Sequence, residues 1–368
     1  MNDPSKRRIS ALRFSTTLLS TAIFFLACQD PAENDPMVKA YVTLQGIDKV
    51  AVIDVSKRVV LKNIDVDFQD TGDRPHHIVI DKTNGFWYVT LISSGYVLKY
   101  SLETDEFIDS VRVGNMPALL ALDEMSQTLY VSRFMPMPGM GMMASNSTVV
   151  NIIDASTMTI KKNLSVEARS PHGIALSADG QTLWVASNEA SHFFKIETSL
   201  IYHDNYQPNA FKLGSDVPDN YTVNDMLYNA LELELSSDNS KLFITCSGSN
   251  EIRVFDTTTG DSLATYDLSN QPWHLAISMD NRTVYTTNRG AATVSKIDLS
   301  NGDISILSDS LLALPHGCML TPDESELIVT ASGGNRIVFV DIETMQLVDE
   351  INLETSMSMP TGLAVVEE

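Results

Sequence analysis

Short hydrophobic stretches recur along this chain, and seven of them contain the same three-residue pattern. The pattern is a large aromatic or aliphatic residue, a β-branched or small residue, and then Thr, Ser or Ala. In six copies a second hydrophobic stretch ends 13 residues after the pattern begins, and in the copy at Tyr130 the distance is 24 residues. β-rich repeats of roughly 40 to 60 residues predict a fold in which each unit packs against its neighbours. The seven copies are Tyr41-Val42-Thr43, Tyr88-Val89-Thr90, Tyr130-Val131-Ser132, Trp184-Val185-Ala186, Phe243-Ile244-Thr245, Tyr285-Thr286-Thr287 and Ile328-Val329-Thr330.

An alternating stretch begins each unit and predicts its first strand. Residues three and five places after the start are mostly large and apolar, whereas those two and four places after it are often small, as Gly173 and Ala175 are. This alternation indicates a strand buried on both faces, one of them close to a neighbour. Turns rich in Asp, Asn and Gly follow and predict a hairpin to the next strand. The first strands begin at Pro75, Pro117, Pro171, Ala230, Pro272, Pro315 and Pro360.

Two further strands complete each unit, and four antiparallel strands repeated radially make the blades of a β-propeller. The last segment, Pro360 to Val366, supplies only a first strand, and the region after Lys39 supplies the other three. Joined together, they predict a composite blade that leaves no free edge. We therefore predict an all-β fold: a seven-bladed β-propeller over residues 38–368, with four antiparallel strands per blade and a composite N- and C-terminal blade.

The repeated pattern resembles that of the YVTN-repeat family of bacterial surface and periplasmic propellers, named after Tyr-Val-Thr-Asn. The resemblance covers residues 38–368, although the Asn of the name is mostly missing and only Asn188 and Asn288 follow the pattern. It implies the seven-bladed fold and an exported protein. It leaves the activity open, because propellers carry many unrelated functions.

The first 28 residues have the composition of an export signal. A basic start is followed by an apolar stretch, Phe14 to Ala27, which is too short for a permanent transmembrane helix. It ends at Cys28, in a context similar to the lipid-attachment site of bacterial lipoproteins. We expect residues 1–28 to be a lipoprotein-type signal peptide and residues 29–37 to be a flexible tether. The expected location is the cell envelope, as an outer-membrane lipoprotein facing the periplasm or the cell surface.

The charge of the chain limits its partners. Its formal net charge is −22, which argues against binding to nucleic acid or to anionic membrane surfaces. We expect a monomer that meets the membrane only through its lipid anchor. Besides Cys28 only Cys246 and Cys318 are present, and both are predicted to be small core residues.

Imidazoles are concentrated where the first strands begin. We call the residues one and two places after each starting residue the first and second positions. Five of the seven His occupy these positions, and Glu232 occupies a second position with Glu234 two residues further on. A ring of imidazoles and a carboxylate around the mouth of the central channel predicts a ligand or metal site, for which copper or another divalent metal is a candidate. The alternative is that each His bonds the backbone of a neighbouring blade. The candidate residues are His76, His77, His172, Glu232, His274 and His316.

A loop rich in Met is predicted on the same face, after Phe134. Its Pro and Gly residues are incompatible with a helix or a core strand. Thioethers bind Cu(I), but Met also forms adaptable apolar surfaces, so copper binding, an apolar lip and plain loop packing stay open. The residues concerned are Met135, Met137, Met140, Met142 and Met143.

Three functions agree with this sequence. The first is an exported, lipid-anchored propeller that binds a small-molecule ligand or an envelope partner through the His- and Met-rich face of its channel. The second is a copper-binding or copper-dependent protein, and the third is a metal-dependent hydrolase resembling the lactonases. No catalytic residues are assigned, because the sequence has no nucleophile elbow, phosphate loop or Rossmann fingerprint. We favour the first function, which is not enzymatic.

Overall fold

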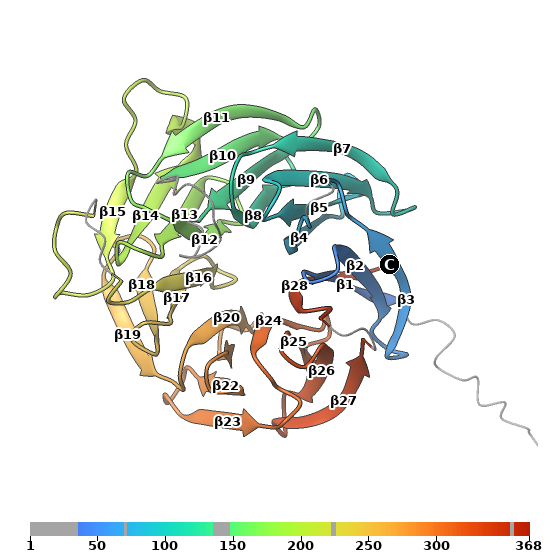
Figure 1. Cartoon of the computed structure of the whole chain (residues 1–368). Helices are drawn as coiled ribbons and strands as arrows, with labels where there is room; N and C mark the ends of the chain where they lie inside the picture. The colour runs from blue at the N-terminus through green and yellow to red at the C-terminus, as the bar shows by residue number, and fades with distance from the viewer. Residues whose placement is uncertain (1–35, 70–71, 135–147, 222–225, 354–356) are drawn as a thin grey trace, which may run out of the picture. The chain divides into compact units, whose positions relative to one another are not determined.

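The computed structural model describes residues 36–69, 72–134, 148–221, 226–353 and 357–368. From Met37 onward the chain is one compact unit. It contains seven four-stranded antiparallel sheets, arranged as the blades of a β-propeller around a central channel (Figure 1). The predicted fold is confirmed. In the described part of the chain, no helix is long and apolar enough to cross a membrane.

Each blade has four strands that follow one another from the channel outward. Blade 1 consists of β28 (Pro360–Glu367), β1 (Val38–Leu44), β2 (Lys49–Asp54) and β3 (Val59–Asp65). Blade 2 consists of β4 (Pro75–Asp81), β5 (Phe86–Leu91), β6 (Tyr96–Ser101) and β7 (Phe107–Arg112). Blade 3 consists of β8 (Pro117–Asp123), β9 (Thr128–Arg133), β10 (Val149–Asp154) and β11 (Thr159–Ser165). Blade 4 consists of β12 (Pro171–Leu176), β13 (Thr182–Ser187), β14 (His192–Glu197) and β15 (Asn209–Lys212), with a short 3-10 helix at Thr198–Leu200. Blade 5 consists of β16 (Ala230–Leu235), β17 (Lys241–Cys246), β18 (Glu251–Asp256) and β19 (Ser262–Asp267). Blade 6 consists of β20 (Pro272–Ile277), β21 (Thr283–Asn288), β22 (Thr293–Asp298) and β23 (Ile304–Ser308). Blade 7 consists of β24 (Pro315–Leu320), β25 (Glu326–Ala331), β26 (Arg336–Asp341) and β27 (Gln346–Asn352).

The composite blade closes the ring as predicted. Strand β28 pairs antiparallel with β1, with Leu363 opposite Val42 and Val38 opposite Glu367. The first and last strands of the described chain therefore share one sheet, and β1 is paired on both sides.

The hydroxyl of the three-residue pattern connects each blade to the next. In six blades this side-chain oxygen accepts the backbone N–H of the second position in its own blade, at 2.8–3.1 Å. It also donates to the backbone C=O of the first position in the next blade, at 2.5–3.1 Å. Both groups are buried, so satisfying them stabilises the contact between blades and explains why Thr or Ser recurs there. The hydroxyls belong to Thr43, Thr90, Ser132, Thr245, Thr287 and Thr330.

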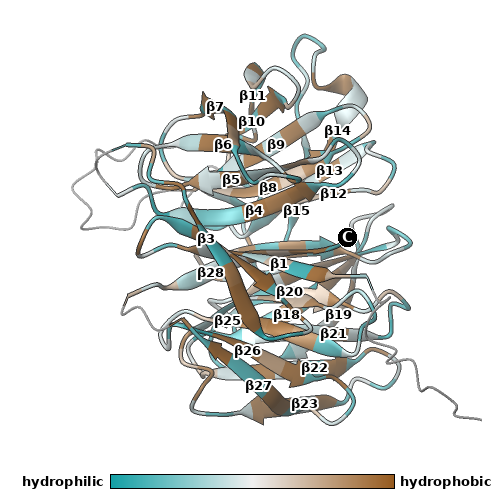
Figure 2. Cartoon of the chain, turned by 90° about the vertical axis from the view of Figure 1, so that its right-hand side faces the viewer, coloured by the Kyte–Doolittle hydropathy of each residue, from teal (hydrophilic) through white to brown (hydrophobic). Residues whose placement is uncertain are grey.

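Apolar side chains fill the space between neighbouring sheets. In Figure 2 the hydrophobic residues lie mainly on the strands, and the connecting loops are mostly hydrophilic. The largest buried side chains include Trp87, which stacks on Tyr100 with 4.1 Å between ring centroids, and Trp184. Cys246 and Cys318 are free and buried, as predicted.

The segment 202–228 is divided by a strand. Strand β15 lies inside it and forms the outer edge of blade 4.

Candidate ligand-binding channel

The seven first strands surround the channel and all run in the same direction along it. We call the end where they begin the His end, and the end where they finish the loop end. Four imidazoles meet at the His end: His76 and His172 have ring centroids 6.3 Å apart, and His316 lies 5.4 Å from His76 and 4.9 Å from His274. The exposed fraction of each of these four residues is only 5–7%. The structure thus brings together four of the six side chains that the sequence singled out.

Burial keeps most of these imidazoles neutral. It holds the pKa of His76 and of His316 well below the usual range, and neighbouring imidazoles and Arg289 add to the effect. It lowers the pKa of His172 to about 4, although a hydrogen bond to the backbone of Leu231 opposes this shift. These rings are packed against one another at this end of the channel.

His172 has a structural role that follows from a missing hydroxyl. Blade 4 carries Ala186 where six other blades carry Thr or Ser, so no pattern hydroxyl is available to bond the first position of blade 5. The Nδ1 of His172 lies 2.6 Å from the carbonyl oxygen of that residue, Leu231. The imidazole therefore donates the hydrogen bond that the hydroxyl supplies elsewhere.

His77 and Glu232 occupy second positions and make equivalent contacts. The backbone N–H of Leu120 donates to Nδ1 of His77 at 3.2 Å, and that of Leu275 donates to Oε2 of Glu232 at 3.0 Å. Both side chains thus bond the backbone of the next blade. For His77 this is the alternative to ligand binding that the sequence left open. The same Glu232 oxygen also accepts a hydrogen bond from Nδ1 of His274 at 2.6 Å.

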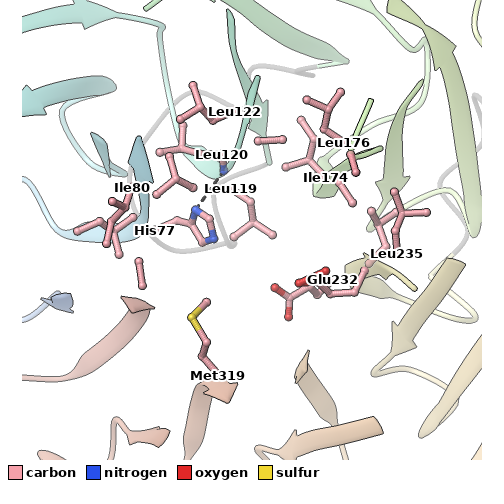
Figure 3. A pocket seen from close by; sticks show the side chains of 18 of the residues that line it. His77, Ile80, Leu119, Leu120, Leu122, Ile174, Leu176, Glu232, Leu235 and Met319 are labelled. Atoms are coloured by element: carbon pink, nitrogen blue, oxygen red, sulfur yellow. Dashed lines mark hydrogen bonds between the residues drawn. The ribbon is translucent and has the colours of Figure 1, made fainter. Parts of the chain in front are cut away.

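A cavity of about 510 Å³ lies in the channel between the second positions and the loop end. Most of the residues that line it are apolar. The wall ends at Glu124, Ala178, Ser237 and Asn239, in the loops that follow the first strands. Figure 3 shows His77, Leu119, Glu232 and Met319 directed toward the open space. Of the six predicted site residues, His77 and Glu232 line this cavity, whereas His76, His172, His274 and His316 lie beyond it. The apolar wall residues include Ile78, Ile80, Leu120, Leu122, Ile174, Leu176, Leu233, Leu235, Leu363 and Val365.

Glu234 is the second carboxylate in the cavity wall. Enclosure by the channel raises its pKa to about 8, and the negative charge of Glu232 adds to this shift. The side chain is nevertheless exposed to the channel, so water inside it moderates the effect.

The described residues give a metal site little support. Nowhere in them do three His, Cys, Asp or Glu side chains converge to hold a metal ion. At the His end the Nδ1 atoms of His76, His172 and His274 are already bonded to Gln45, Leu231 and Glu232. The predicted Met-rich loop, Met135 to Met143, and the predicted lipidation site Cys28 lie outside the described residues.

Fold and channel together define a seven-bladed β-propeller with a ligand-sized apolar cavity on its axis. No family model matches the sequence. The chain is 26% identical over 216 residues to the uncharacterized protein YncE of Salmonella typhimurium, an alignment that covers 58% of this chain and 54% of that protein. YncE of Salmonella typhi matches equally. The chain thus spans about half the length of the curated relatives it matches. The predicted resemblance to a known family of seven-bladed propellers is confirmed.

Solved structures share the architecture at low sequence identity. A periplasmic gluconolactonase from Pseudomonas aeruginosa is 14% identical with a TM-score of 0.67, and the match covers 90% of this chain and 99% of that one. A protein of unknown function from Desulfotomaculum acetoxidans is 14% identical with a TM-score of 0.66, covering 89% and 98%. A streptogramin B lyase is 15% identical with a TM-score of 0.62, covering 79% and 86%. At these identities the likeness shows the fold alone.

Proposed function

We propose that this protein binds a small-molecule ligand in the central channel of its propeller and does not transform it. The observation that carries the proposal is the cavity of about 510 Å³, which is within the size range of ligand pockets and mostly apolar, with a few polar groups. The cavity wall reaches the loops that follow the first strands, so we expect a ligand to enter from the loop end.

The imidazoles that could act as bases support a role without catalysis. His172 and His77 have pKa values lowered to about 4 and about 3 by burial, and their Nδ1 atoms are bonded to backbone groups of the next blade. A general base needs a pKa closer to the working pH and access to the substrate.

One contact favours a hydrolase as the second candidate. Glu232 accepts a hydrogen bond from His274, an arrangement that orients the imidazole as in acid–base pairs. His274 lies behind the cavity wall and is 6% exposed, so this candidate requires movement of the wall. A copper protein, the other alternative, would depend on Met residues outside the described part of the chain.

A neutral fluorescent probe tests the proposal. N-phenylnaphthylamine added to protein purified from cells expressing the full chain is expected to bind and brighten. Leu176→Trp places a bulky side chain in the cavity and is expected to abolish this signal, whereas Met125→Trp, at a residue that is 87% exposed, leaves it unchanged. Probe binding that survives Leu176→Trp contradicts the proposal. Stoichiometric copper in protein from the native host would favour the copper alternative.

A further inference from the structure

The ionisable groups that can carry a charge in the cavity wall are all acidic. The wall contains three carboxyl groups, Glu124, Glu232 and Glu234, and neither Lys nor Arg is among its lining residues. The one imidazole in the wall, His77, is neutral because burial lowers its pKa to about 3. The electrostatic potential inside is therefore negative, and the low-dielectric wall strengthens it.

Glu232 is held in place for an interaction with the cavity. One of its oxygens, Oε2, accepts both the Leu275 N–H and the His274 Nδ1–H, and Figure 3 shows the carboxylate directed into the open space. The two hydrogen bonds fix the position of the negative charge before any ligand arrives. A charge fixed in this way binds a complementary group without first losing conformational entropy.

Glu234 lies on the same strand two residues further along, so it points to the same side as Glu232. The charge of Glu232 helps to raise the pKa of Glu234, so the empty cavity disfavours the ionised form of Glu234. A positive charge between the two groups favours that ionised form, whereas an anion opposes it.

The apolar part of the wall specifies the rest of the ligand. Leu and Ile side chains from blades 1 to 5, with Met319 from blade 7, line the cavity around the two carboxyl groups. A bare divalent cation needs several oxygen ligands, and the described residues bring no three suitable side chains together. A hydrocarbon body would bury these apolar surfaces.

We infer that the ligand of this channel is an organic cation, with an ammonium group held by Glu232 and Glu234 and an apolar body packed against the Leu and Ile wall. The inference rests on the proposed function and specifies its ligand class. It excludes phosphorylated and carboxylated compounds as ligands of this cavity.

Three probes of equal chain length test it: octylammonium, octanol and octanoate, measured by titration calorimetry with the full-chain protein. Octylammonium is expected to bind about tenfold more tightly than octanol, which corresponds to about 1.4 kcal/mol, and octanoate the most weakly. Glu232→Gln and Glu234→Gln together are expected to remove the preference and leave octanol binding unchanged. Glu103→Gln, at an exposed turn, removes one negative charge away from the channel and serves as the control.

The outcomes separate this inference from the proposed function. Equal binding of octylammonium and octanol overturns the inference that the ligand is an organic cation. The proposal that the channel binds a small molecule would still hold. A preference that persists in the double Gln variant, with unchanged thermal unfolding, also overturns it. If none of the probes binds, including the neutral fluorescent one, the proposed function itself fails.

Discussion

The two ends of the channel are built from the same strands, yet they differ in what their polar side chains do. At the His end, imidazoles are packed ring against ring, and His172 bonds the backbone of the next blade. Toward the loop end, Glu232 and Glu234 face an open apolar space. A cluster of titratable residues around an axis can therefore be structural at one end and available for binding at the other.

The difference follows from position in the first strand. The carbonyl oxygens of the first positions are buried between blades and need donors. At second positions Gly allows close approach of the next blade, because a Cβ on Gly362 would clash with the His76 carbonyl oxygen. Where the second position is His77 or Glu232, the side chain lines the cavity. His274, also at a second position, instead bonds Glu232 and packs against His316.

The largest expected effect concerns the hydroxyl that joins two blades at the His end. Thr330→Val leaves the Gly317 N–H without its acceptor and the Thr361 carbonyl without its donor. We expect a loss of about 2 to 4 kcal/mol in the free energy of unfolding, measured by urea denaturation. Thr258→Val, at an exposed turn, is the control and should cost little. Equal effects of the two changes would show that the hydroxyl has no special role.

A smaller effect is expected at blade 4, where the imidazole replaces the hydroxyl. His172→Phe keeps a ring of similar shape but removes the donor to Leu231, at a cost of about 1 to 3 kcal/mol. Ala186→Thr introduced into a His172→Ala background should recover part of the lost stability, because it restores the hydroxyl of the other blades. If stability does not recover, His172 does not replace the hydroxyl that Ala186 lacks.

The pH dependence of that effect sharpens the comparison. The pKa of His172 is lowered in the folded protein to about 4, so between pH 6.5 and 4 the unfolded chain binds the proton and the folded chain does not. Its contribution to stability is present above pH 6.5 and is lost as the pH falls toward 4. The stability difference between wild type and His172→Phe should therefore shrink over this range in urea titrations at successive pH values. A difference that stays constant would contradict a neutral, buried His172.

The smallest effect on stability is expected for Glu234, and its dependence on pH is opposite to that of His172. A folded-state pKa of about 8, above the usual 4.5, means that its contribution is present below pH 4.5 and is lost as the pH rises toward 8. Carbon NMR of the labelled side chain should show a raised pKa, and Glu232→Gln should lower it by removing a negative charge. An ordinary pKa in the wild type would show that channel water screens the site fully.

The sequence was sufficient for the architecture because the repeat itself encodes it. The starting Pro residues, the three-residue pattern and the lone first strand at Pro360 determine the number of blades and the composite closure. The meeting of His76, His172 and His316 follows from their shared first position once the ring is closed.

The cavity could not be found in the same way. Leu122 and Leu176 follow the pattern of core residues, and whether such side chains meet across the axis depends on the diameter of the ring. The role of His172 did leave a signal in the sequence, since Ala186 interrupts the hydroxyl pattern in the same blade. The missing hydroxyl at Ala186 can be interpreted only once the structure shows that the other pattern hydroxyls donate to the backbone of the next blade.

The register of the composite blade also determines which side of the molecule an anchor would hold. Val38 pairs with Glu367 at the loop end, where every other blade has a hairpin loop, so the chain enters the propeller beside the rim of the cavity. Any group attached to the described start of this sheet would therefore lie near the cavity entrance, whereas the packed imidazoles lie at the opposite end of the channel.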